Sequence, residues 1–163
     1  MPETDELVIN TGPLLALIAG TGNLSILELL YKRVLVPLEV CREIEKGGES
    51  GFGLSEFKKS KFITKHTTLL KLTPFLKSSL DIGEASVIQL ALDKNIHTVC
   101  IDESVGRRIA RLNKLKLTGS IGILIRAKKA GCDFSMHDAI KQMQSKGIYL
   151  SQKVIDFAFK QII

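Results

Sequence analysis

The chain has 163 residues, of which 45% are hydrophobic and 25% charged, and its formal net charge is +6. This composition excludes a disordered tail, a collagen-like fibre and a low-complexity linker, and the length predicts a single domain over residues 1–163. The positive charge suits an anionic partner, although it is modest for a protein that binds nucleic acid. The three cysteines match no zinc-binding spacing, so we expect small buried residues there.

The N-terminal region predicts neither export nor a membrane span. Residues 1–6 are acidic and lack the basic segment of a signal peptide, so we expect a cytoplasmic protein. The uncharged stretch 7–27 is interrupted by polar residues and glycines. These interruptions predict a strand, a turn and short helices instead of a membrane helix.

Strands and helices alternate along most of the chain. The β-branched run 6–10 predicts a strand, and Pro13 is well placed as the first residue of the following helix. Further strands are predicted at 33–36, 61–65, 98–101 and 115–117. Helices are predicted at 14–18, 24–30, 37–44 (ended by Gly47 and Gly48), 85–92 and 103–113, with a break at 20–23 and a loop around Pro74. This alternation predicts a three-layer α/β/α sandwich with a central parallel sheet.

From Gly119 onward only helices are expected, at 121–130, 135–145 and 151–160. The last two helices form a C-terminal extension over about residues 134–163. Apolar residues recur there at helical spacing, which predicts either core or a self-association surface. The residues concerned are Ile140, Met143, Val154, Phe157 and Ile162.

Polar residues just after strands are the first candidates for a site, because ligands of open parallel sheets bind outside the carboxyl ends of the strands. Asn10 ends the first strand and Asp102 follows the strand 98–101, so both would project from one edge if these strands are neighbours. Glu43, on the helix after the second strand, and Glu84, in the first turn of a later helix, would complete an acidic pocket.

Each of these residues also has a purely structural interpretation. Glu84 and Asp81 have the spacing of a capping box, and Asp102 can cap the helix that follows it. Glu43 has charged neighbours, as on a solvated helix face, and Asn10 can form an Asx turn. Spacing alone therefore suggests a metal site without deciding for it.

Three strings combine several rare spacings in one order and are therefore the segments most useful for recognising a family. They are LDIGEASVIQLA, TVCIDESVGRRIA and LTGSIGILIRAKKAG. Together with ELVINTGPLLALIAGTGNLSIL and VLVPLEVCREI, they resemble the PIN-domain family, and specifically its VapC-like prokaryotic branch. The resemblance covers most of the chain. It implies a metal-dependent endoribonuclease that uses Mg²⁺ or Mn²⁺, commonly the toxin of a toxin–antitoxin pair, so that RNA and an antitoxin protein are the implied partners.

The resemblance also implies a site built from acidic residues that bind metal and act in catalysis. The positions that match the family's acids are Asn10, Glu43, Glu84 and Asp102. Asp81 and Glu103 are nearby acids suited to outer contacts with water or metal, and Thr11 matches the small hydroxyl residue that often follows the first acid. Asn10 departs from the pattern, because an amide offers a carbonyl oxygen without negative charge, which predicts weaker metal binding.

Basic residues close to Asp102 are candidates for contacts with RNA phosphates. Arg107 and Arg111 share one helix face, with Arg108 beside them, and Thr11 would contribute from the pocket. The alternative is an ordinary solvated helix face, since no aromatic residues interleave with the arginines for base stacking.

Three functional interpretations follow from the sequence. The first is the metal-dependent endoribonuclease. The second is a catalytically weakened or inactive module that binds RNA or protein, with Asn10 as the mark of the lost site. A Rossmann-like nucleotide-binding protein is disfavoured, because no GxGxxG turn follows the first strand. The apolar helices within 14–30 would either form a homodimer face or antitoxin groove, or simply cover the sheet.

Overall fold

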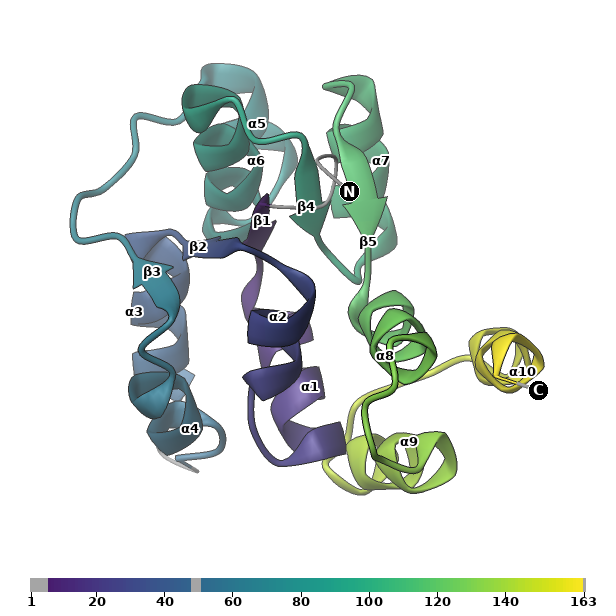
Figure 1. Ribbon diagram of the computed structural model, residues 1–163. Coiled ribbons are helices and arrows are strands. Elements are labelled where there is room, and N and C mark those ends of the chain that lie inside the picture. The colour runs from purple at the N-terminus through teal and green to yellow at the C-terminus, as the bar shows by residue number, and fades with distance from the viewer. Residues whose placement is uncertain (1–5, 48–50, 163) are drawn as a thin grey trace.

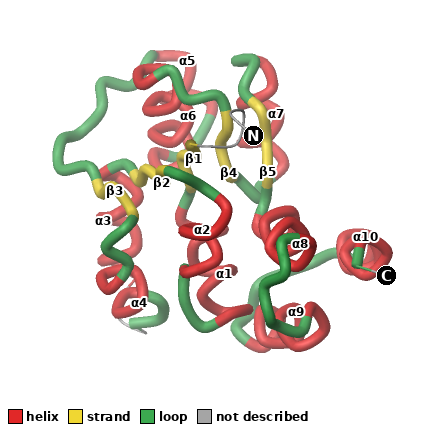
Figure 2. Tube along the Cα trace, viewed as in Figure 1, coloured by secondary structure: helices red, strands yellow, loops and turns green. Residues whose placement is uncertain are grey.

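The computed structural model describes residues 6–47 and 51–162. Residues 1–5 and Gly48, which entered the expectations about export and about the end of a helix, lie outside this part. Within it, a five-stranded sheet has the order β3-β2-β1-β4-β5, and its neighbouring strands are all parallel (Figures 1 and 2). Helices flank the sheet, which confirms the predicted α/β/α architecture.

The strands are short, and the central ones are almost entirely buried. They are β1 (Glu6–Ile9), β2 (Arg33–Val36), β3 (Ile63–Lys65), β4 (Thr98–Cys100) and β5 (Lys116–Thr118). In the middle of the sheet, Val8 is paired with Leu35 of β2 and with Val99 of β4. All of the predicted strands are therefore present: β2 has the predicted bounds, and the ends of the others differ by at most two residues.

The helices connect the strands and cover the sheet. They are α1 (Thr11–Thr21), α2 (Ser25–Leu30), α3 (Leu38–Lys46), α4 (Leu54–Lys59), α5 (Pro74–Ser79), α6 (Ile82–Lys94), α7 (Ser104–Leu112), α8 (Ser120–Lys129), α9 (Met136–Ser145) and α10 (Gln152–Gln161). Helix α6 packs against β1 and β4 and contacts α3, α5 and α7, whereas α2 packs against β2 and contacts α8. Within the described residues, no helix is both long and apolar enough to cross a membrane.

Three helical predictions were wrong. Helix α1 begins at Thr11 instead of Pro13 and continues to Thr21, and its real end is marked by Gly22 in the left-handed conformation (φ +88°). Helix α4 lies in the polar stretch before β3, for which no helix was predicted. Helix α5 begins at Pro74, where a loop was expected, and Thr73 caps it by accepting a hydrogen bond from the N–H of Leu76 at 3.5 Å.

The apolar residues of α1 and α2 are used mainly inside the domain. Leu14, Leu17, Leu24 and Leu27 are buried, α1 contacts α3, α8 and α9, and α2 contacts β2 and α8, so packing within the molecule accounts for most of the apolar character of these helices. Leu29 remains 57% exposed. The last two helices differ from each other. Helix α9 packs along α1 and buries Met143, whereas α10 lies at the outer margin of the molecule, where it contacts α8 and α9 (Figure 1).

We predict that Met143→Ala destabilises the whole domain, because it opens a cavity between α9 and α1. The expected loss is about 2–5 kcal/mol in the free energy of unfolding, measured by urea denaturation. Lys141→Ala, on the exposed side of the same helix, is the control and should change this free energy by less than about 0.5 kcal/mol. Equal effects of the two variants would show that α9 is not packed on α1 in solution.

Candidate functional site

The pairing of β1 with β4 brings the ends of two distant segments together. The N–H of Asn10 donates to the carbonyl oxygen of Cys100 at 3.1 Å, directly beyond the last paired residues of the two strands. The strand order reverses between β1 and β4, and such a switch point is where open parallel sheets bind ligands. Strands β1 and β4 are therefore neighbours, which was the condition for Asn10 and Asp102 to project from one edge of the sheet.

A pocket of about 230 Å³ lies at this edge. It is lined by Asn10, Thr11, Gly12, Pro13, Glu43, Asp81, Glu84, Asp102 and Glu103. The four positions matched to the family's acids thus share one pocket, together with the two nearby acids and Thr11. The three arginines proposed to contact RNA belong to α7, outside this lining.

Helices α3 and α6 approach each other closely at the pocket. The Thr11 hydroxyl donates a hydrogen bond to Oε1 of Glu43, which ties α3 to the start of α1. A methyl group on Gly83 would lie 2.7 Å from the same Glu43 oxygen and 3.4 Å from Oδ1 of Asn10. Glycine at position 83 is therefore what allows these oxygens to converge beside α6.

Asn10 places an unpartnered oxygen in this space. Its side chain is 8% exposed, and within the described part of the chain Oδ1 has no hydrogen-bond partner and caps no helix N–H. The interpretation of Asn10 as an Asx turn is therefore wrong. A buried carbonyl oxygen without a donor is costly, and a water, another proton donor or a cation at this place would satisfy it.

Glu84 is the buried carboxyl group of the pocket, with 5% exposure. Its N–H donates to Oδ1 of Asp81 at 2.8 Å, which confirms the predicted cap at the start of α6. Its carboxyl group faces α7, since a methyl group on Gly106 would lie 3.1 Å from Oε2. Burial, reinforced by the negative charges of Asp81, Glu103 and Glu43, raises the pKa of Glu84 from 4.5 to about 7.

Asp102 is held by a residue that the sequence did not point to. The N–H of Ser120 donates to Oδ1 at 2.8 Å, and the Ser120 hydroxyl donates to Oδ2 at 2.9 Å. Asp102 thus binds the beginning of α8, and Glu103 occupies the N-cap of α7, so the predicted cap of α7 by Asp102 was wrong. No local spacing in the sequence indicates the contact, because Ser120 follows a different strand.

The arginines after Asp102 do not share one environment. Nη1 of Arg107 donates to the carbonyl oxygens of Ile101 at 2.7 Å and Thr118 at 3.2 Å, so this guanidinium group joins the ends of β4 and β5. Arg108 and Arg111 are exposed. Arg108 and Arg111 therefore present their charges to solvent, whereas the guanidinium group of Arg107 is bound to the backbone.

The donor atoms of the pocket suit a hard cation that keeps part of its water shell. They are carboxylate, amide and hydroxyl oxygens, the ligands that Mg²⁺ and Mn²⁺ prefer. Among residues 6–47 and 51–162, no three His, Cys, Asp or Glu side chains lie close enough together to enclose a metal. An ion held by one or two carboxylates, the amide oxygen of Asn10 and several waters fits this arrangement, because Mg²⁺ usually binds one or two carboxylates and keeps several waters.

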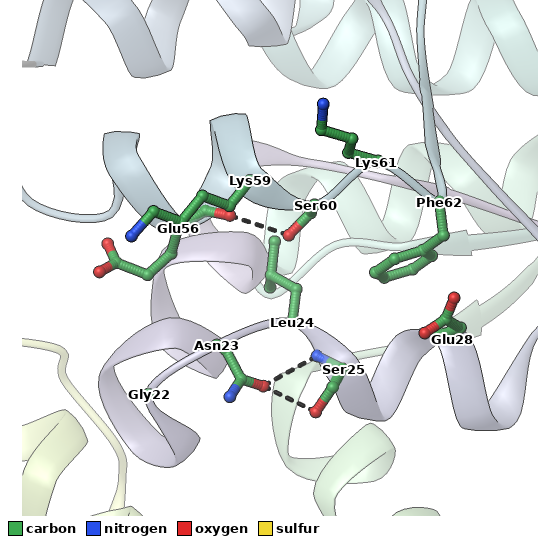
Figure 3. Close-up of a pocket in the computed structure, with 10 residues that line it drawn as sticks. All are labelled: Gly22, Asn23, Leu24, Ser25, Glu28, Glu56, Lys59, Ser60, Lys61 and Phe62. Atoms are coloured by element: carbon green, nitrogen blue, oxygen red, sulfur yellow. Dashed lines mark hydrogen bonds between the residues drawn. The ribbon is translucent and has the colours of Figure 1, made fainter.

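A larger pocket, of about 510 Å³, lies between the start of α2 and the end of α4 (Figure 3). Two lysines and two glutamates surround Leu24 and Phe62 there. Three of its polar side chains are bonded locally: Asn23 accepts from the N–H and the hydroxyl of Ser25, and Ser60 donates to the carbonyl oxygen of Glu56 (Figure 3). These groups do not converge on a ligand, so the smaller acidic pocket is the candidate functional site.

A family model described as PIN domain matches residues 6–162, nearly the whole chain and including α9 and α10. The chain therefore belongs to the PIN-domain family, whose members are in general nucleases that use divalent metal ions. No curated protein matches the chain significantly.

We predict that Glu84→Gln stabilises the metal-free protein above neutral pH. The folded state keeps the Glu84 proton up to about pH 7, whereas the unfolded chain loses it near 4.5, so this carboxyl group lowers stability as pH rises through that window. The difference in unfolding free energy between variant and wild type should grow to about 3 kcal/mol above pH 7. Urea denaturation in EDTA at several pH values measures it, and parallel pH profiles of the two proteins would contradict it.

Proposed function

We propose that this member of the PIN-domain family is an endoribonuclease that depends on Mg²⁺ or Mn²⁺. The observation that carries the proposal is the unpartnered, buried Oδ1 of Asn10 in a pocket that also holds Glu43, Glu84 and Asp102. A pocket with this charge repels a phosphodiester, and a bound divalent cation removes that repulsion. The cation would be held by Asp102, Glu84 and Asn10, and Glu43 lies on the side of Asn10.

The residues of the pocket have separate tasks in this proposal. Ionised Glu84 and Asp102 provide the negative charge that binds the cation, and Asn10 adds a neutral oxygen. The Thr11 hydroxyl restrains Glu43, which keeps one of its oxygens on the side of Asn10. A divalent metal held by these residues would supply Lewis-acid chemistry: it would neutralise phosphate oxygens and lower the pKa of water.

The basic side chains outside the pocket support RNA as the substrate. Arg108 and Arg111 are exposed on α7, the helix that begins beside Glu103 of the pocket, and the chain carries a net charge of +6. Phosphates of a bound strand would contact these arginines while one phosphodiester enters the pocket. Arg107 would act on RNA only indirectly, because it binds two backbone carbonyl groups.

We further propose that the nuclease is the toxin of a toxin–antitoxin pair in the cytoplasm and that it forms a homodimer. The VapC-like sequence pattern supports the toxin role, and the exposed Leu29 on α2 and Phe157 on α10 are apolar groups available to a protein partner or a second copy. A second candidate function is an RNA- or protein-binding module without catalysis. The observation that favours it is the neutral Asn10 at the position of the family's first acid.

We predict metal-dependent cleavage of RNA that requires Glu84 and Asp102. A set of labelled single-stranded and structured RNAs is incubated with Mn²⁺, Mg²⁺ or EDTA, and products are followed on denaturing gels. Glu84→Gln and Asp102→Asn should each lower the cleavage rate by more than about a hundredfold, because they remove metal-binding charge. Asn10→Asp should lower the Mn²⁺ concentration needed for half-maximal rate by about tenfold or more, since it adds a charge beside the cation.

The exposed Asp133 supplies the matched control, and Asp133→Asn should cleave like wild type. Because Glu84→Gln is expected to stabilise the fold, its loss of activity cannot be attributed to unfolding. If wild type is inert on every RNA while Asn10→Asp cleaves, the binding module is the better description. Cleavage that persists in EDTA would refute the proposed metal dependence.

We also predict that Arg108 and Arg111 contribute to RNA affinity through phosphates. Arg108→Ala and Arg111→Ala should each weaken binding without changing sequence preference, and should reduce the slope of log affinity against log salt concentration by about 1. Fluorescence anisotropy at several salt concentrations measures both effects. Lys153→Ala, which removes an exposed charge on α10, should leave the slope unchanged, and equal slopes for all four proteins would exclude this surface.

A further inference from the structure

The carboxylate of Asp102 is fixed at both oxygens by one residue. Ser120 is the first residue of α8 and is 1% exposed. Its N–H donates to Oδ1 at 2.8 Å and its hydroxyl donates to Oδ2 at 2.9 Å. Because Ser120 is buried while Asp102 is exposed, the carboxylate presents one side to the protein and the other to the pocket.

Hydrogen bonds join the ends of β4 and β5, and this brings Ser120 within reach of the Asp102 carboxylate. Nη1 of Arg107 bridges the carbonyl oxygens of Ile101 and Thr118, and the N–H of Ile101 donates to the same Thr118 oxygen at 3.1 Å. These contacts lock the residue before Asp102 to the segment that leads into Ser120. A side chain at position 119 would block the approach, because a methyl group on Gly119 would lie 2.7 Å from Oδ1 of Asp102.

This support differs from that of the other oxygens in the pocket. Glu43 receives its bond from the Thr11 hydroxyl on one oxygen, and Oδ1 of Asn10 has no partner among the described residues. The two donors on Asp102 come from a helix N-terminus and a buried hydroxyl group, so rotation of the carboxylate breaks both bonds. An ionised carboxylate has about four lone-pair sites, and the two bonds to Ser120 leave the others for a ligand.

We propose that Ser120 is a positioning residue for the divalent cation. Its hydroxyl fixes the rotation of the Asp102 carboxylate so that the remaining lone pairs face the pocket, and Arg107 and Gly119 make that contact possible. The inference rests on the proposed function, since it assigns to Asp102 a bound cation. Loss of a group that orients a metal ligand typically weakens metal binding 10- to 100-fold, which sets the expected effect.

The test measures Mn²⁺ binding without RNA, by the electron paramagnetic resonance signal of free Mn²⁺. Ser120→Ala should weaken binding at least about tenfold, and Ser120→Thr, which keeps the hydroxyl group, should restore it. Ser86→Ala is the matched control: Ser86 is equally buried, but its hydroxyl donates to the Gly83 carbonyl oxygen at 2.6 Å. Its Mn²⁺ affinity should equal that of wild type. Thermal unfolding of each variant verifies that the proteins compared are folded.

Ser120→Cys is included in case Ser120→Ala does not fold, because a thiol is only a weak donor of nearly the same size and should also weaken binding. Wild-type affinity in the folded Ser120→Ala or Ser120→Cys protein would overturn the inference while leaving the proposed function intact. Failure of Ser120→Thr to restore binding would also overturn it, since the hydroxyl group would then not be the cause. If wild type neither binds Mn²⁺ nor cleaves RNA, the proposed function fails and the inference fails with it.

Discussion

The pairing of β1 with β4 in the middle of the sheet is the contact on which the candidate site depends. It makes neighbours of Asn10 and the segment around Asp102, which are more than half of the chain apart in sequence. Because the strand order reverses there, the connections from the two strands diverge, as is usual where open parallel sheets bind ligands. Helix α6 packs over the same two strands, so Glu84 at its first turn reaches the same place.

The acidic side chains of the pocket repel one another, and they differ in how far they are exposed to water and hydrogen-bonded. Glu43 and Asp102 are exposed to water and receive hydrogen bonds from Thr11 and Ser120. Glu84 is buried between α6 and α7, and burial together with the neighbouring charges raises its pKa to about 7. Such a perturbed carboxyl group in a cleft is typical of functional sites, where a ligand supplies the missing positive charge.

Asn10 changes the balance of this pocket. An aspartate at that position would add a further negative charge next to Glu43 and Glu84, and would raise both the repulsion in the empty pocket and the attraction for a cation. The amide keeps an oxygen in place without this charge. A protein with asparagine is therefore expected to be more stable without metal and to need more metal for activity. The firm anchoring of Asp102 by Ser120 gains importance in such a site, because fewer charges share the cation.

The sequence by itself determined the features that depend on neighbours along the chain. Alternating apolar runs located the five strands, the Asp81–Glu84 spacing gave the start of α6, and the ordered motifs identified the PIN-domain family. The short helices α4 and α5 were not predicted, because six residues are too few to show a clear helical period of apolar residues. Tertiary structure alone decided that β1 lies beside β4, that Ser120 holds Asp102 and that Arg107 binds backbone carbonyl groups. These contacts join segments from different strands and helices, and local patterns carry no information about which strands become neighbours.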